Sequence, residues 1–362
     1  MATVYLLDSV KVATSTTGTG SVTVGAAEPG YLTPAEAGAV DGRVYTWRLD
    51  DGDDFEIFIG TYSSAGPTVS RDTVLYSKIS GVAGTTKLTL SGSAKLSAVP
   101  VVDYVVTPRQ IREILTTNRT YYVRTDGNDN NTGLSNSSGG AFKTIQKAID
   151  TIATLDIGSH DVTIQVGDGT YTDVITVTGP WRGTGSVTVV GNTTTPANVV
   201  LDTPVAAVTV RSGGRLNISG FTVTTGGHGL HVETNGVLSL TGPMVFGTCM
   251  FDHVSASYGG IVLITSNYTI TGGCRWHWNA SEGGNIVVQG RTITLMGTPT
   301  FNIFARADLL GSILCNSNTF SGSANGTRFS ATMNGSIQTF GAGDTYLPGN
   351  ASGVTATGGQ YG

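Results

Sequence analysis

The sequence predicts an all-β protein whose larger part is a parallel β-helix, and three observations support this prediction. Glycine is abundant, with 51 copies in 362 residues, and only 12% of the residues are charged. This balance suits strands and turns rather than a helical enzyme. Short runs of alternating or continuous apolar residues recur along the chain. In its C-terminal part they recur at a nearly constant interval, which is the mark of a repeat architecture.

The repeat consists of six segments in which a glycine precedes four mostly apolar or alternating residues. They begin at Gly214, Gly236, Gly260, Gly284, Gly311 and Gly335, at intervals of 22 to 27 residues. One short strand-like run precedes each segment and another follows it, ending with DTYL (344–347). Three strands per coil indicate a parallel β-helix. VTIQV (162–166) and SVTVV (186–190) fit earlier coils, so that eight coils form a rod of roughly 40 Å.

The sequence pattern of residues 1–103 predicts a separate small β-sandwich or barrel. The segment 10–24 contains two short strands around Gly18-Thr19-Gly20, and 44–62 contains two more around Asp51-Gly52, a strong hairpin signal. The segment KLTLSGSAKLSAV (87–99) supplies a last pair of strands. The N-terminal part is therefore expected to be antiparallel and compact.

Two helices are expected beside the strands. Residues 104–118 predict a linker helix, because Thr107 and Gln110 fit a capping box and Pro108 suits the first helical position. An amphipathic helix near 142–155 has isoleucines on one side at 145, 149 and 152. Laid across the open end of the β-helix (119–362), it protects an edge that is otherwise unpaired.

Composition also limits the possible partners. The net charge is −5, from 20 basic and 25 acidic residues, and no lysine or arginine cluster suggests a nucleic-acid groove. No apolar run approaches the length of a membrane helix. The N-terminal segment lacks the pattern of a secretion signal, so we expect synthesis in a cytoplasm without export by that route. No cofactor is expected.

Several segments resemble phage proteins. YYVRTDGNDNNTGLS (121–135), FKTIQKAIDTI (142–152) and VTIQVGDGTYTDVITV (162–177) resemble the opening of pectate-lyase-like right-handed β-helix proteins of phage tail spikes and fibres. Residues 10–71 resemble an N-terminal domain that recurs on phage tail and fibre proteins, and 341–362 is similar to the C-terminus of phage β-helix fibres. The family's lyases use calcium-binding aspartates and a catalytic arginine, and no such constellation is found in this sequence.

The resemblance implies a structural virion component, a homotrimeric fibre or spike of a tail or head that binds host surface glycans. Residues 1–103 are then expected to attach the chain to other virion proteins, and 119–362 to contact the host polysaccharide. The alternative is a polysaccharide depolymerase, a glycosidase or lyase on the same scaffold. A secreted adhesin fits less well without a secretion signal.

Three histidines occupy similar places in successive coils. His231, His253 and His277 lie in GLHV, FDHV and RWHW, where strict alternation places them outside and Trp276 and Trp278 inside. They form either a metal or pH-sensitive site or, as we favour, a polar ladder on an exposed face. The same register sends Asp252 inward, and we expect a β-bulge to prevent this.

Aromatic residues offer a glycan platform. Tyr258, Trp276 and Trp278 are the candidates for stacking on sugar rings, although alternation favours both tryptophans as core residues beside Phe304 and Phe329.

Candidate catalytic residues are sparse. Glu282 and Asp308 precede strand-start glycines in adjacent coils, but we expect both to be solvated turn residues and expect no catalysis. The run Asp126–Asn131 is explained better by turn chemistry than by a cation site. Cys249 and Cys274 are expected to be buried thiols, and together with Cys315 they form no disulfide framework.

Overall fold

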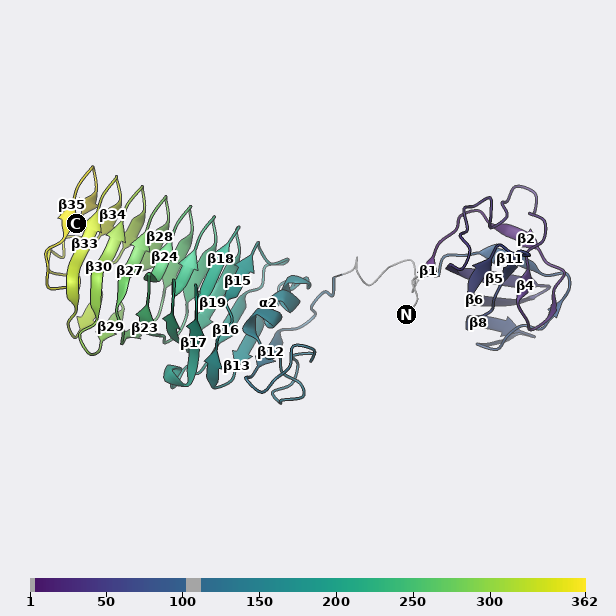
Figure 1. Ribbon diagram of the computed structural model, residues 1–362, viewed down its shortest axis with the longest axis horizontal. Coiled ribbons are helices and arrows are strands. Elements are labelled where there is room, and N and C mark those ends of the chain that lie inside the picture. Colours follow the sequence, from purple (N-terminus) through teal and green to yellow (C-terminus); the bar gives the residue numbers. More distant parts are fainter. Residues whose placement is uncertain (1–3, 102–111) are drawn as a thin grey trace. The chain divides into compact units, whose positions relative to one another are not determined.

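The computed structural model describes residues 4–101 and 112–362, which belong to two compact units, Met1–Ile111 and Arg112–Gly362. The described chain is all-β apart from short helical segments, as predicted (Figure 1). In this part of the chain, none of the helices is long and apolar enough to cross a membrane.

The N-terminal unit is a mainly antiparallel assembly around a small apolar core. Its strands are β1 (Val4–Tyr5), β2 (Lys11–Ala13), β3 (Thr17–Gly18), β4 (Val22–Thr23), β5 (Val44–Asp51), β6 (Asp54–Ser63), β7 (Thr68–Val69), β8 (Thr73–Ile79), β9 (Val82–Gly84), β10 (Leu90–Ser91) and β11 (Lys95–Ala98). The hairpin at Asp51-Gly52 is confirmed, since β5 and β6 pair up to Asp51 and Asp54. The strands β10 and β11 form but do not pair with each other, because β10 joins β3 whereas β11 joins β2 and β5.

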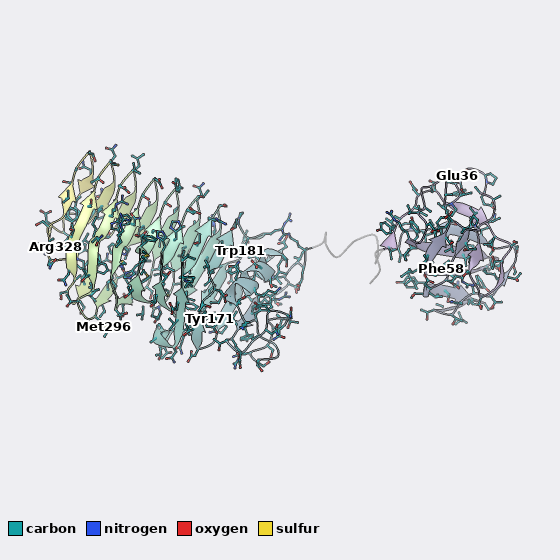
Figure 2. All side chains as sticks on the ribbon, in the orientation of Figure 1. Glu36, Phe58, Tyr171, Trp181, Met296 and Arg328 are labelled. Atoms are coloured by element: carbon teal, nitrogen blue, oxygen red, sulfur yellow. The ribbon has the colours of Figure 1, made fainter. Side chains whose placement is uncertain are left out.

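Trp47, Leu49 and Phe58 have zero exposure in this core. Figure 2 labels Phe58 among the strands of the unit. A buried ion pair lies in the same unit. Arg71 and Glu56 have fully buried side chains and contact each other through two pairs of atoms, of which Nε and Oε1 are 2.9 Å apart. Both also bind the backbone of Leu88.

The C-terminal unit is a β-solenoid of about eight coils, which confirms the predicted right-handed parallel β-helix. Each coil supplies one strand to each of three parallel sheets (Figure 1). Sheet I contains β12 (Arg119–Val123), β13 (Val162–Val166), β16 (Val187–Val190), β19 (Arg215–Ser219), β22 (Val237–Leu240), β25 (Ile261–Ile264), β28 (Asn285–Val288), β31 (Ser312–Leu314), β34 (Ser336–Gln338) and β36 (Gln360–Tyr361). The glycine-led repeat therefore corresponds to sheet I.

The runs that follow and precede this repeat form the other two sheets. Sheet II contains β14 (Gly169–Tyr171), β17 (Val199–Thr203), β20 (Thr222–Thr225), β23 (Val245–Cys249), β26 (Tyr268–Ile270), β29 (Thr292–Leu295) and β32 (Thr319–Ser321). Sheet III contains β15 (Ile175–Thr178), β18 (Val208–Arg211), β21 (Leu230–Val232), β24 (Asp252–Ala256), β27 (Cys274–Ala280), β30 (Thr300–Ala307), β33 (Asn325–Ala331) and β35 (Val354–Thr355). The prediction of a strand at 344–347 is wrong, because these residues form turns.

The repeated glycines mark the corner between sheets III and I. A Cβ atom on Gly284 would lie 2.1 Å from the carbonyl oxygen of Ala256 in the preceding coil, and one on Gly311 would lie 2.2 Å from that of Ala280. Only glycine permits this close approach of two backbones. Tyr258 and Glu282 lie two positions before the repeated glycines Gly260 and Gly284. Their φ angles of 47° and 50° are in the left-handed region.

Helix α2 (Ile145–Ala153) packs its buried isoleucines into the N-terminal end of the solenoid core, as predicted. Its N-cap is Thr144, whose hydroxyl accepts a hydrogen bond from the amide of Lys147. Asp129 accepts hydrogen bonds from the amides of Lys143 and Thr144 and from the Thr144 hydroxyl. The polar run around Asp129 therefore anchors the helix start.

The predicted linker helix is not found in the part that the structure describes. Its first residues fall in 102–111, outside the described residues. Residues 112–118 are not helical, because the chain there joins the solenoid. Ile114 forms a parallel bridge with Asp156, and Leu115 is buried in the core.

Candidate functional site

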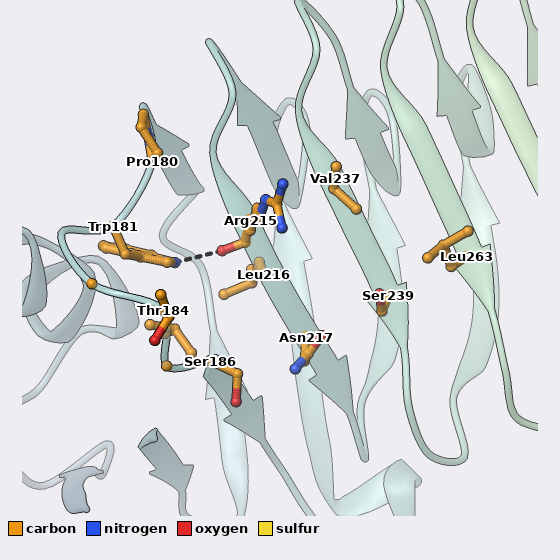
Figure 3. A pocket seen from close by; sticks show the side chains of 13 residues that line it. Pro180, Trp181, Thr184, Ser186, Arg215, Leu216, Asn217, Val237, Ser239 and Leu263 are labelled. Carbon is orange, nitrogen blue, oxygen red and sulfur yellow. Dashed lines mark hydrogen bonds between the residues drawn. The ribbon is translucent and has the colours of Figure 1, made fainter. Parts of the chain in front are cut away.

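A groove lies on the outer face of sheet I, and Figure 3 shows its lining. Its volume is about 630 Å³. The side chain of Trp181, from the loop after β15, stands at one end and is half-buried. Its indole Nε1–H donates a hydrogen bond of 2.6 Å to the carbonyl oxygen of Arg215. The ring is therefore held in a fixed orientation over the first coils of the sheet.

The floor of the groove consists of outward residues at equal positions of successive coils. Asn217, Ser239 and Leu263 are paired in register, and Arg215 is paired with Val237 in the same way. Thr184 and Ser186 add hydroxyls beside Trp181 (Figure 3). An aromatic face beside hydroxyl, amide and small apolar groups has the chemistry that accepts a sugar ring.

Two glycines fix the loop that carries Trp181. Gly183 has a φ of 116°, and a Cβ atom there would lie 2.4 Å from the carbonyl oxygen of Gly158. A Cβ atom on Gly185 would lie 1.9 Å from the carbonyl oxygen of His160. The loop is thus pinned to the preceding coil, so the groove is formed before any ligand arrives.

The outer face of sheet III carries a second polar cluster. His231, Ser255, Asn279 and Arg306 follow each other in register on four successive coils. The His231 Nδ1 lies 2.7 Å from the Ser255 hydroxyl, and Arg306 donates a hydrogen bond of 2.9 Å to the Asn279 side-chain oxygen. Burial, followed by the nearby imidazole of His228, lowers the pKa of His231.

The three predicted histidines do not share one position. His231 faces outward, as expected, but His253 and His277 are fully buried inside the solenoid. Strands β24, β27 and β30 each place two consecutive residues in the core, with zero exposure for His253 and Val254 and for His277 and Trp278. The prediction of an outward polar ladder is therefore wrong for His253 and His277. Among the described residues, no group of three His, Cys, Asp or Glu side chains is placed to hold a metal ion.

The same break in alternation moves Trp276 outward. Trp278, Phe304 and Phe329 are core residues as predicted, but Trp276 is only half-buried. The guanidinium groups of Arg275 and Arg306 lie over its ring, 4.0 Å and 4.3 Å from the centroid. The indole is therefore already engaged by two cations.

Asp252 is buried, with zero exposure. The expected β-bulge is not found, since β24 and β27 pair without a register shift. Asp252 lies in register with the outward-facing Trp276, and its carboxylate is covered by His228 and Asn279.

Tyr258 and Trp276 do not form one platform. Tyr258 is 57% exposed in the turn after β24, in a different part of the coil from Trp276. A hydrogen bond with Glu282 raises the pKa of the Tyr258 hydroxyl.

The two candidate acids have different environments. Glu282 is exposed in its turn, as expected. The prediction that Asp308 is a solvated turn residue is wrong, because its side chain is buried, with 5% exposure, and forms an ion pair with Arg306. Burial raises the pKa of Asp308, although the Arg306 guanidinium acts in the opposite direction. Glu282 and Asp308 do lie in adjacent coils, since Gly283 donates a backbone hydrogen bond to Leu309.

The three cysteines are free and buried, as predicted for Cys249 and Cys274. Burial raises the pKa of Cys249 and of Cys315 to about 12, and that of Cys274 is raised for the same reason. These thiols are therefore unreactive core residues.

The groove at Trp181 is the feature that sequence reasoning missed. The loop from Pro180 to Gly185 interrupts the repeat, and its single tryptophan was the available signal. His228 was missed as well because it precedes its strand and lies outside the alternation.

Comparisons with models of protein families, with curated proteins and with solved structures find no match to this chain. The fold and the sites described above therefore define its class as a β-solenoid protein with an N-terminal antiparallel β unit.

Proposed function

We propose that this chain is a fibre or spike subunit of a bacteriophage-like particle that binds host surface glycans. In this proposal the chain is made in the bacterial cytoplasm, residues 1–103 attach it to a tail or capsid protein, and the solenoid recognises the host. A rigid scaffold that carries a preformed site supports this division of roles.

The groove at Trp181 carries the proposal. It combines an oriented indole with the hydroxyl and amide groups of Thr184, Asn217 and Ser239, on a surface poor in charge. Such a surface suits a neutral segment of a polysaccharide, which offers apolar C–H faces and many hydroxyls.

We further propose that the subunit is a homotrimer. Ile261, Val287 and Leu314 alternate with buried residues and therefore face outward on sheet I. At the adjoining corner Leu310 is 69% exposed. A second copy of the chain is the occupant that suits this uncharged apolar stripe.

Sedimentation velocity tests the assembly. The chain should sediment as three copies at micromolar concentration, and Leu314→Asp together with Leu310→Asp should shift it to one copy. Asp substitutions on sheet II at the outward residues Thr269 and Thr294 are the matched control. A wild-type chain that sediments as a stable monomer contradicts the trimer.

Binding to a panel of immobilised bacterial capsular and lipopolysaccharide glycans tests the groove. Trp181→Ala should weaken binding at least tenfold, and Ser239→Trp should do the same by filling the groove while Trp181 stays intact. Tyr258→Ala, which alters the exposed aromatic of another site, should bind like the wild type. Normal binding by both groove variants would overturn the assignment.

Removal of 1–103 tests the attachment role. The truncated chain should fail to join the particle but should still adsorb to host cells. Normal incorporation of the truncated chain contradicts the division.

A depolymerase is the second candidate, and the buried Asp308 beside Glu282 favours it. Glycoside hydrolysis uses two carboxyl groups in different environments, and here one is buried and the other is exposed in the adjacent coil. New reducing ends after incubation with host capsule, abolished by Asp308→Asn or Glu282→Gln, would replace simple binding with cleavage.

A further inference from the structure

His228 and Asp252 form a hydrogen-bonded pair at the corner before sheet III. The His228 Nδ1 lies 2.9 Å from Oδ2 of Asp252. The Asp252 side chain has zero exposure, whereas that of His228 is 34% exposed. A carboxylate only accepts hydrogen bonds, so the neutral imidazole that donates to it from Nδ1 keeps its lone pair on Nε2. No described residue forms a hydrogen bond with this Nε2.

Neighbouring side chains hold both groups in place. Asn279 donates a second hydrogen bond, of 3.3 Å, to Oδ2 of Asp252. The ring of His228 stacks on that of His231 at 4.9 Å and lies 5.2 Å from that of Phe251. The imidazole is thus oriented by a buried carboxylate and by two rings, which is the arrangement that a general base requires.

An exposed apolar side chain lies beside the imidazole. Phe251, which is 37% exposed, has its ring 5.2 Å from that of His228. Val205 and Met250, which are 55% and 65% exposed, belong to neighbouring coils, and the backbone of each forms a hydrogen bond with Thr225, three residues before His228. An apolar group close to the imidazole suits a short acyl group.

We propose that His228 and Asp252 form a general-base site that hydrolyses acyl esters, with O-acyl groups on saccharides as the substrate class. The ester hydrolysis does not depend on glycan binding at Trp181, and only the saccharide part of the substrate rests on the proposed function.

The reaction needs water and no other reactant. His228 Nε2 removes a proton from a water molecule as the water oxygen bonds to the ester carbonyl carbon. The tetrahedral intermediate then breaks its bond to the alcohol oxygen, and the imidazolium returns the proton to that oxygen. The products are a carboxylic acid and an alcohol. Asp252 acts as a positioning residue, because it holds the tautomer and stabilises the imidazolium.

The surroundings favour ester hydrolysis with water as the nucleophile. Glycoside hydrolysis requires two carboxyl groups that reach the substrate, but Asp252 is enclosed, and Glu233 lies 3.6 Å from His231 and 4.0 Å from Arg211. Ser255 is 2% exposed, and its hydroxyl is bound to His231, so it is not an accessible nucleophile.

Hydrolysis of 4-nitrophenyl acetate by the full chain tests the proposal. His228→Gln should lower kcat at least tenfold, and Asp252→Asn should lower kcat with KM unchanged, because the asparagine no longer holds the reactive tautomer. His160→Gln, which removes a histidine outside this face, is the matched control and should have the wild-type rate. Release of acetate from an O-acetylated polysaccharide should follow the same order.

Two outcomes would overturn the proposal. One is an unchanged rate for His228→Gln, which is informative on its own because this residue is partly exposed and its replacement should fold. The other is a wild-type rate for a folded Asp252→Asn variant, which would indicate an isolated surface imidazole. Glycan binding by His228→Gln and Asp252→Asn is measured in parallel with ester hydrolysis, so that loss of glycan binding and loss of ester hydrolysis are distinguished.

Discussion

The Nδ1 atoms of His253 and His277 lie 2.9 Å apart inside the solenoid, and both side chains are fully buried. The partners of the other ring nitrogens fix the protons. His253 Nε2 donates to the Gly247 carbonyl oxygen at 2.7 Å, so its Nδ1 accepts from the Nδ1–H of His277. His277 Nε2 then accepts from the Tyr268 hydroxyl at 2.7 Å, and Trp278 donates to that hydroxyl oxygen. Each donor has an acceptor only while both histidines are neutral.

Stability should therefore fall as the pH is lowered below about 6.5, the usual pKa of an unfolded histidine. Burial lowers the pKa of His253 to about 4 and lowers that of His277 well below its ordinary value. Between pH 6.5 and about 4 the unfolded chain binds protons that the folded chain excludes. Each histidine then contributes a loss of about 1.4 kcal/mol per pH unit, and the loss is absent above neutral pH.

Urea unfolding at several pH values measures this effect. The double variant His253→Gln, His277→Gln keeps polar side chains in the core but cannot titrate, so the slope below pH 6.5 should shrink in the variant. An equal slope in both proteins would show that other groups cause the acid sensitivity.

Tyr268→Phe should destabilise the solenoid by about 1–3 kcal/mol, because His277 Nε2 and the Trp278 indole N–H lose their buried partner. Tyr122→Phe is the matched control, since no hydrogen bond of its hydroxyl is found in the described structure. The free energies of unfolding of the two variants give the comparison. A loss no larger for Tyr268→Phe than for Tyr122→Phe contradicts the network.

Glu56→Gln should destabilise the N-terminal unit by about 3–5 kcal/mol, because it leaves the Arg71 guanidinium buried without its counter-ion. Asp50→Asn breaks the half-exposed pair with Arg48 and should cost less than about 1 kcal/mol. Hydrogen exchange read by mass spectrometry should show faster exchange in 4–101 for Glu56→Gln and no change in 119–362. Equal protection in both variants would refute the prediction.

Gly284→Ala should destabilise the solenoid by about 2–4 kcal/mol, because the added methyl group would lie 2.1 Å from a backbone oxygen of the preceding coil. Gly139→Ala is the control, since a Cβ atom there meets no atom within 4 Å. Thermal unfolding compares them, and equal melting temperatures would exclude the close approach as the reason for the glycine.

Periodicity predicted the solenoid because each coil repeats the same three strands, and it placed Trp278 and Phe304 correctly in the core. It failed within β27, where His277 and Trp278 both face inward, because the alternation is broken inside that strand. The groove depends on Trp181 reaching the backbone of Arg215, 34 residues away. Asp308 is buried by its ion pair with Arg306 and by the turn around it. Neither contact recurs from coil to coil, so the repeat in the sequence does not predict it.

The corner glycines also determine how the rod can change in length. Since Gly284 and Gly311 each bring one backbone against the coil before it, every coil ends in the same relation to its neighbour. A coil depends on adjacent coils alone, so an added or deleted coil beyond the Trp181 groove moves the distal end by one step of about 4.8 Å and leaves the groove intact. The length of the solenoid can therefore change in steps of one coil without any change in the residues that line the groove.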